Sequence, residues 1–197
     1  MRQIPAQLAS KLYGAAELIA ERGIADAKIG EIAEAAGIPV ATLYYYFSGK
    51  EEILAFLLGD LLESIAGAVG LAIGQPGTAG DRLRWAVEAQ MRVMLENPAA
   101  CRALVGDLGR ATRLPELAAA LDTAFHQPLE RLLTEGIEDG SLRPLPDVNK
   151  AALSIFGAVT VAGLMGTVSE PEQTSEFIEQ TSAAVCDLLV EGLRPRT

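Results

Sequence analysis

The sequence is poor in the side chains that most enzymes and metal sites use. Its 197 residues include one histidine, His126, and two cysteines, Cys101 and Cys186, which lie far apart in the chain. Two separated cysteines give neither a disulfide framework nor a metal-ligand spacing, and one histidine cannot form a ligand pair. No glycine-rich phosphate loop and no serine, histidine and aspartate set is recognisable. We therefore expect no metal, no cofactor and no enzyme activity.

Charged residues are also few, and they make up 21% of the chain against 50% hydrophobic residues. This balance excludes intrinsic disorder as the main state and predicts a folded protein with a generous apolar core. We expect no apolar run to approach the roughly 18–20 uncharged residues that a membrane span requires, and we find no signal peptide at the N-terminus. The prediction is a soluble, cytoplasmic protein with no membrane partner.

The formal net charge of −10 is unevenly distributed along the chain. Residues 1–50 carry five cations and five anions, so the whole excess of negative charge lies beyond Lys50. A nucleic-acid binder usually carries a basic surface, and only the neutral first part of this chain could face a polyanion. We therefore predict two domains with different electrostatic properties, 1–50, which extends into the start of a helix expected at 50–73, and 51–197.

Helical spacing of apolar residues occurs almost everywhere, whereas strand patterns are scarce. Gly23 and Gly37 are expected to end helices, Asp81 to cap one, and Pro128 to kink or break another near Phe125. The prediction is an all-α fold of about nine helices, at about 5–22, 29–36, 39–46, 50–73, 81–96, 99–108, 115–138, 147–167 and 172–193.

Residues 29–47 describe two short helices joined by a turn at Gly37. Glycine supplies the turn, and the small residues Ala33 and Ala36 let the two helices cross closely. This is the arrangement of a helix-turn-helix, whose second helix can lie in the major groove of DNA.

The block from Ile29 to Leu54 resembles the DNA-binding domain of the TetR family of transcriptional regulators. The resemblance rests on Ile-Ala-Glu-Ala-Ala-Gly, then Thr-Leu-Tyr-Tyr-Tyr-Phe, then Lys-Glu-Glu-Ile-Leu. It implies an all-helical homodimer whose C-terminal domain binds a small molecule and thereby lowers the affinity for a palindromic operator in double-stranded DNA. Repression is the usual mode of the family. The sequence departs from the family pattern at Pro39, where Ser or Thr is common, and at Val40, where a polar residue is frequent.

The expected DNA contacts follow from residue type. Hydroxyls of threonine and tyrosine and lysine ammonium groups suit phosphate oxygens, while small apolar side chains suit thymine methyl groups. An alternative for Tyr44 is an aromatic plug between helices. The candidate DNA-binding residues are Lys28, Pro39, Val40, Ala41, Thr42, Tyr44, Tyr45, Tyr46 and Lys50.

The last two helices are predicted to form a homodimer interface, because a helix that is apolar nearly all round must be covered on both sides. A dimer sets two recognition helices one DNA turn apart, about 34–36 Å. The alternative is that the two helices bury each other in a monomer. The candidate interface residues are Val159, Gly163, Phe177, Thr181, Ala184 and Leu188.

A small, apolar effector is expected to bind among the helices between Asp81 and Met165, where methionine and aromatic side chains offer adaptable apolar surface. Plain core packing is the alternative for each lining residue. A second function also remains open at this point, a helical carrier of small molecules or lipids without DNA binding, which would have no use for adjacent exposed tyrosines. The candidate ligand-binding residues are Trp85, Met91, Met94, Phe125, His126, Phe156 and Met165.

Overall fold

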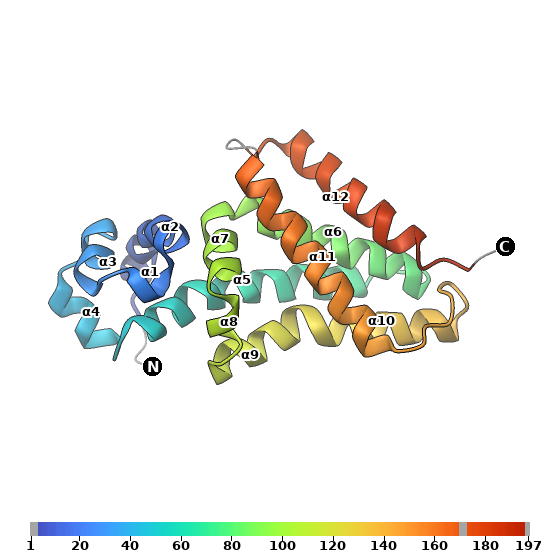
Figure 1. The fold of residues 1–197 in the computed structure, drawn as a ribbon, viewed down its shortest axis with the longest axis horizontal. Helices are drawn as coiled ribbons and strands as arrows, with labels where there is room; N and C mark the ends of the chain where they lie inside the picture. The colour runs from blue at the N-terminus through green and yellow to red at the C-terminus, as the bar shows by residue number, and fades with distance from the viewer. Residues whose placement is uncertain (1–3, 170–172, 196–197) are drawn as a thin grey trace. The chain divides into compact units, whose positions relative to one another are not determined.

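The computed structural model describes residues 4–169 and 173–195, and this part of the chain contains helices and turns but no strand (Figure 1). The predicted all-α fold is confirmed. The chain divides into two compact units. The first comprises Met1–Leu61 and Ala99–Ala118, and the second comprises Leu62–Pro98 and Ala119–Thr197.

The first unit begins with α1 (Ala6–Leu12), a 3₁₀ turn (Tyr13–Ala15) and α2 (Ala16–Asp26). The predicted helix over 5–22 is therefore interrupted at the 3₁₀ turn. Its predicted end is correct, because Gly23 has φ 73° and ψ 153° and turns the chain out of the helix. Only glycine adopts such a left-handed φ without strain.

Two short helices follow, α3 (Ile29–Ala35) and α4 (Val40–Tyr46), and Gly37 between them has φ 61°. The side chains that hold the two helices together are buried and apolar. They include Ile32 and Ala33 of α3, Leu43 of α4 and Phe47 just after α4. The helix-turn-helix thus has its own core, to which Leu12 and Ile19 also belong as buried residues of the preceding helices.

The long helix α5 (Lys50–Ile73) has the predicted bounds and continues from the first unit into the second. After α6, the chain returns to the first unit with α7 (Pro98–Gly106), α8 (Leu108–Ala111) and the start of α9 (Pro115–Leu121). Residues 99–118, which the sequence assigned to the C-terminal domain, are therefore compact with the helix-turn-helix.

The second unit is built around α6 (Ala79–Glu96), which packs against α10 (Gln127–Glu138), α11 (Val148–Ser169) and α12 (Ser175–Glu191). The residue that caps α6 is Thr78 and not Asp81, whose expected role is wrong. The Thr78 hydroxyl accepts the Asp81 N–H at 3.2 Å, and the Asp81 carboxylate accepts the Thr78 N–H at 3.2 Å. This reciprocal pair is a capping box, in which the acidic residue occupies the third helical position.

The predicted break near Phe125 is confirmed, and it takes the form of a π-helical turn at Asp122–His126 between α9 and α10. Pro128 lies in the first turn of α10 and has no N–H to offer the carbonyl of Ala124 four residues earlier. A helix with one wider turn accommodates this missing hydrogen bond, and such turns are frequent at functional sites.

Two helices, α5 and α11, are long and apolar enough to cross a membrane by length and composition alone. The expectation that no apolar run approaches that length is therefore wrong. Fewer than half of the residues in the apolar window of each helix are buried inside the protein. For α11 the reason is that one face packs on α6 while leucine, valine and methionine side chains stay exposed on the other.

Candidate functional site

The turn between α3 and α4 is fixed by backbone hydrogen bonds. Gly37 donates its N–H to the Glu34 carbonyl at 3.0 Å, and Ile38 donates to the Ala33 carbonyl at 2.9 Å. The second bond spans five residues and closes α3 in the manner of a Schellman motif, which requires the left-handed glycine. The angle at which α4 leaves α3 is therefore set by the backbone rather than by flexible side chains.

The outward face of α4 consists of Val40, Ala41, Tyr44 and Tyr45, all exposed. Tyr44 and Tyr45 are each 60% exposed, so Tyr44 is not the aromatic plug considered as its alternative. Thr42 and Tyr46 are half-buried, and the Tyr46 ring meets the edge of Tyr45 at 4.9 Å. The helix presents apolar surface and phenol hydroxyls, and it carries no charge.

Pro39 stands at the N-cap of α4 rather than at its first helical position. Its carbonyl accepts the N–H of Thr42 at 2.8 Å, so the proline starts the helix through its backbone and offers no side-chain cap. Lys28 occupies the corresponding N-cap position of α3 and is exposed, with its backbone N–H donated to Glu31 at 3.0 Å. Hydrogen bonding by this N–H lowers the pKa of Glu31, and Arg22 contributes by its ion pair at 2.9 Å.

Lys50 lies at the start of α5, and its ammonium group donates to the carbonyl of Ala25 and, at 3.4 Å, to that of Ala27. Two of its three N–H donors are thus engaged within the protein, at the segment that joins α2 to α3. A phosphate contact is left to the remaining donor. Lys50 therefore fixes the position of the helix-turn-helix on α5 in addition to any contact with DNA.

Sequence reasoning missed Asp107, a buried carboxylate that accepts the N–H of Ile24 at 2.8 Å. Ile24 follows Gly23, where the helix breaks, and its N–H would otherwise lack a partner inside α2. Arg110 lies 3.6 Å from Asp107 and 3.5 Å from Glu51. The signal available in the sequence was the helix stop at Gly23, which frees a backbone donor, but no pattern indicates which distant acceptor meets it.

The candidate ligand-binding residues fall into separate places in the second unit. Met91, Met94 and Phe125 are buried, and the rings of Phe125 and Phe156 meet edge to face at 4.9 Å. These residues belong to the core where α6, the π-helical turn and α11 meet. The other three candidates, Trp85, His126 and Met165, are half-buried or exposed.

Trp85 is half-buried near Gly77 at the beginning of α6, and Met165 is 53% exposed on α11. His126 lies near the surface. Its Nδ1 is 3.3 Å from Asp122, and its Nε2 is 3.3 Å from the side-chain amide of Asn149.

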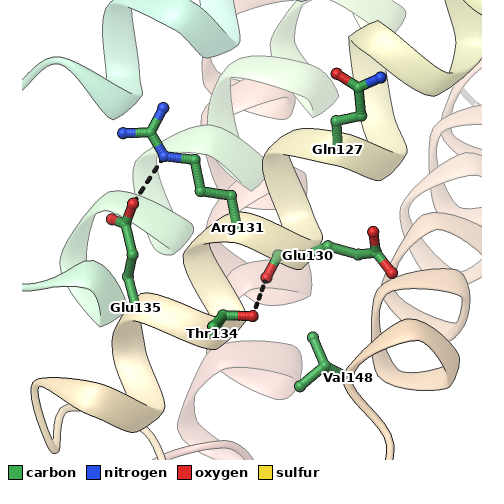
Figure 2. Close-up of a pocket in the computed structure, with 6 residues that line it drawn as sticks. All are labelled: Gln127, Glu130, Arg131, Thr134, Glu135 and Val148. Atoms are coloured by element: carbon green, nitrogen blue, oxygen red, sulfur yellow. Dashed lines mark hydrogen bonds and ion pairs between the residues drawn. The ribbon is translucent and has the colours of Figure 1, made fainter.

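A surface hollow of about 630 Å³ lies beside α10 and the start of α11 (Figure 2). Its walls are largely charged or polar. Arg131 and Glu135 form an ion pair at 2.7 Å, and Thr134 donates its hydroxyl to the Glu130 carbonyl at 2.9 Å. The ion pair lowers the pKa of Glu135, so this wall is ionised at neutral pH. None of the candidate ligand-binding residues lines this hollow.

The candidate dimer residues divide between two faces. Val159 and Gly163 are buried on the side of α11 that packs on α6, where a Cβ on Gly163 would lie 2.8 Å from the Met94 side chain. Phe177 and Thr181 are half-buried, whereas Ala184 and Leu188 of α12 are exposed. The exposed apolar side chains on α11 are Leu153, Val161, Met165 and Val168.

Within the described residues, no group of three or more histidine, cysteine, aspartate or glutamate side chains is arranged to hold a metal ion. The short helix pair with an exposed second helix defines the class of this protein, a helix-turn-helix DNA-binding protein. The second unit adds further helices packed around α6.

Comparison with known families agrees with this class. Residues 12–56 match the family described as bacterial regulatory proteins, tetR family, and residues 76–162 match the tetracyclin repressor-like C-terminal domain. The HTH-type transcriptional repressor KstR2 of Rhodococcus jostii (strain RHA1) is 32% identical over 144 residues, which are 70% of this chain and 68% of that protein. The chain belongs to the TetR family of transcriptional regulators.

Another relative is the fatty acid metabolism regulator protein of Bacillus subtilis (strain 168), 28% identical over 182 residues and 91% of each chain. Two solved structures share the fold. FadR from Bacillus subtilis in complex with stearoyl-CoA has a TM-score of 0.73 at 24% identity, over 95% of this chain and 98% of that one. AibR in complex with isovaleryl coenzyme A and operator DNA has a TM-score of 0.74 at 20% identity, over 97% and 100%. The protein is a DNA-binding transcriptional repressor and not an enzyme, and the carrier alternative is set aside.

Proposed function

We propose that the protein binds a palindromic operator as a homodimer and leaves it when an acyl-CoA thioester binds the second unit. The observation that carries the DNA-binding part is the uncharged, exposed outer face of α4. Operator binding and release would take place in the cytoplasm, where bacterial DNA lies.

The residues of α4 divide the work by their chemistry. Val40 and Ala41, at the exposed start of the helix, can contact thymine methyl groups, while the hydroxyls of Tyr44 and Tyr45 can donate to phosphate oxygens. Lys28 adds an exposed charge at the start of α3. Thr42, Tyr46, Pro39 and Lys50 then act chiefly by holding α4 in place, since they are partly buried or engaged by the backbone.

The dimer is proposed to form through the exposed faces of α11 and α12. Leu188 is 78% exposed, and Leu153, Val161 and Met165 are more than half exposed at helical spacing along α11. The part of α11 after Lys150 has no charged residue, so the exposed face of this helix is a continuous apolar strip. A second copy of this chain is the occupant that fits, because an isologous contact covers both strips with the same residues. Val159 and Gly163 support this face from within.

The effector class is supported by the relatives and by the chemistry of the core. One relative is named for fatty acid metabolism, and two proteins of the same fold hold acyl-CoA thioesters in their structures. The core around Met91, Met94, Phe125 and Phe156 is apolar and contains flexible side chains, which suits an acyl chain. The proposal for this chain is accordingly an acyl thioester rather than a sugar or a metal ion.

The experiment begins with selection of bound sequences from a random duplex library by the purified protein, together with its mass in solution. We expect a palindrome and a species of twice 20.8 kDa. The selected duplex is then titrated with isovaleryl-, decanoyl- and stearoyl-CoA while fluorescence anisotropy follows release. Enrichment of no sequence by the folded dimer, or release by none of the three thioesters, would contradict the corresponding part of the proposal.

The role of the tyrosine hydroxyls is tested by Tyr44→Phe and Tyr45→Phe, which keep the ring and remove only the donor. Each should weaken operator binding about fivefold to tenfold, the usual value of one net hydrogen bond. Tyr13→Phe is the matched control, because Tyr13 is also exposed but belongs to the turn before α2. If Tyr44→Phe and Tyr45→Phe bind the operator as tightly as Tyr13→Phe and the wild type do, the two hydroxyls make no contact with DNA.

A further inference from the structure

Several buried side-chain atoms of the second unit, Ser182 Oγ on α12 among them, have no hydrogen-bond partner among the described residues, and two of these atoms belong to buried residues on the packed pair of helices α6 and α11. They are the Oε1 atom of Gln90 on α6 and the Oγ1 atom of Thr160 on α11. Gln90 is fully buried and Thr160 is 3% exposed. An unpaired polar atom in an apolar interior is costly, so native proteins rarely keep one without a bound water or ligand.

The orientation of the Gln90 amide is fixed by its other contact. Its Nε2 donates to the carbonyl of Ala124 at 3.3 Å, and a carbonyl can only accept. Ala124 lies in the π-helical turn, and its carbonyl is the one that Pro128 leaves without the usual helical donor. The amide oxygen of Gln90 therefore faces the other way and needs a donor from elsewhere.

Thr160 differs from most hydroxyl residues in the helices of this unit. Thr134, Ser154, Thr167 and Ser169 each donate to a carbonyl three or four residues earlier in their own helix, at 2.7–2.9 Å. That bond is the ordinary way to satisfy a hydroxyl in a helix. The structure gives Thr160 no such bond, although it is as buried as Thr167.

The packing of α6 on α11 places Gln90 and Thr160 at the same level of the core. A Cβ on Gly163 would lie 2.8 Å from Met94, and one on Gly166 would lie 2.7 Å from Leu95. The residue numbers rise together, so the two helices run in the same direction, as Figure 1 also shows. One turn before the contact of Met94 with Gly163 lie Gln90 on α6 and Thr160 on α11.

Aromatic and methionine side chains border the two polar residues. Phe156 lies one turn before Thr160, and its ring packs on Phe125, the residue after Ala124. Met91 adjoins Gln90, and it is fully buried like Met94. Methionine side chains rearrange easily around an inserted chain. The result is an apolar core with one acceptor and one hydroxyl that its own residues leave unsatisfied.

We infer that Gln90 and Thr160 bind the effector through a neutral hydrogen-bond donor, an amide N–H or a hydroxyl, carried next to its apolar chain. This inference rests on the proposed acyl-thioester effector and specifies which part of it is recognised. The pantetheine arm of an acyl-CoA carries amide N–H groups beside the thioester. A fatty acid anion carries no donor and would bring a negative charge into an apolar core, which is far more costly. The protein thus distinguishes the thioester from the free acid.

The test compares decanoyl-CoA, decanoate and decanamide as releasers of the operator duplex, with direct binding measured by calorimetry. The wild type should respond to decanoyl-CoA and to decanamide and should not respond to decanoate. The response to decanamide, which has N–H donors but no nucleotide, separates recognition of the donor from recognition of the coenzyme A nucleotide. A response to decanoate equal to that of the thioester would overturn the inference.

The variants Gln90→Leu and Thr160→Val remove the polar atoms and keep the volume. Each should raise the concentration of decanoyl-CoA for half-release about tenfold, after normalisation to the variant's own operator affinity. Thr167→Val is the matched control, because it removes a buried hydroxyl of α11 that already has a partner in the helix. It should leave the decanoyl-CoA concentration unchanged.

Thermal unfolding without ligand provides a second measurement that does not depend on release. Thr160→Val should melt at or above the wild-type temperature, because it removes an unpaired hydroxyl, whereas Thr167→Val should melt lower. If the wild type responds to decanoyl-CoA and both variants respond at the same concentration, the two atoms bind internal water only and this inference alone is overturned. If the wild type responds to no thioester, the proposed effector class is wrong and the inference fails with it.

Discussion

At the scale of single residues, Asp107 shows how one carboxylate joins distant parts of the sequence. Its bond to the Ile24 N–H connects the α7–α8 segment to the break in α2 at Gly23. Asp107→Ala should lower the free energy of unfolding by about 1–3 kcal/mol, because it leaves a buried N–H without an acceptor. Asp107→Asn, which keeps an acceptor oxygen, should cost less. Urea unfolding checks the order of the two variants.

Amide hydrogen exchange locates the same effect at one position. The Ile24 amide should exchange faster in Asp107→Ala than in the wild type, while the Leu43 amide in α4 should change only with global stability. Unchanged protection at Ile24 would mean that another acceptor replaces the carboxylate.

The two cysteines make a second prediction at the residue scale. Burial raises the pKa of both the Cys101 and the Cys186 thiols to about 12. Since the thiolate is the reactive form, neither thiol should react with a disulfide reagent in the folded protein at pH 8, and both should react in guanidinium chloride. Fast reaction of one thiol under native conditions would show that the helix around it opens.

At the scale of helices, the sequence predicted where helices begin, end and break better than it predicted which side of a helix is buried. The bounds of α5, the turn at Gly37 and the break near Phe125 followed from glycine, proline and apolar spacing, whose effects are local. The face of α11 could not be predicted, because apolar residues surround the helix and periodicity gives no direction. Only packing on α6 shows that Val159 and Gly163 point inward while Met165 points outward.

The same limit applies to the candidate sites. The exposure of the α4 residues could be predicted, because a helix-turn-helix exposes its second helix by construction. The burial of Gln90 could not be predicted, because a glutamine in an amphipathic helix is expected at a solvated position. Its side-chain amide donates to the carbonyl of Ala124, which lacks its usual helical donor because Pro128 of α10 has no N–H. Such sites depend on contacts between helices, and a single sequence does not record them.

The carboxylate of Asp139, which accepts a backbone N–H at the start of α6, predicts how the stability of the protein depends on pH. Asp139 accepts the N–H of Ala79 at 2.8 Å and that of Ser141 at 2.9 Å, and these bonds lower the pKa of Asp139. A carboxylate whose pKa is lowered by folding stabilises the folded state above its unfolded pKa, near 3.9, and loses this effect as the pH falls through the folded pKa. The stability difference between wild type and Asp139→Asn should therefore be largest near neutral pH and shrink below about pH 4.

Urea unfolding at several pH values measures this difference, with Glu138→Gln as the control that removes the neighbouring exposed carboxylate. A difference for Asp139→Asn that stays constant from pH 7 to pH 3 would show that the amide side chain fails for a reason other than charge.

At the scale of the whole molecule, the proposed dimer makes a prediction about mass. Leu188→Glu places a charge on the proposed interface without disturbing the core, because the side chain is 78% exposed in the single chain. The variant should have the mass of one chain, 20.8 kDa, and should lose most of its operator affinity. Leu71→Glu is the matched control, since Leu71 is 75% exposed on α5 and should leave the mass doubled. A dimer in both variants would place the interface elsewhere.

The small number of available cations predicts that operator binding weakens only moderately as the salt concentration rises. Four cations lie in residues 4–61, and two of them have partners, since Arg22 pairs with Glu31 at 2.9 Å and Lys50 donates to backbone carbonyls. Lys11 and Lys28 remain exposed, so a dimer would neutralise about four phosphates. The logarithm of the binding constant should then fall with the logarithm of salt concentration at a slope of about −4.

Titration of the selected operator between low and physiological salt measures this slope. Lys28→Gln should reduce its magnitude by about 2, one phosphate contact for each protomer of the dimer. A wild-type slope steeper than about −6 would mean that cations outside this group reach the DNA. A shallow slope would instead place most of the affinity in the apolar and hydroxyl contacts of α4, which salt does not screen.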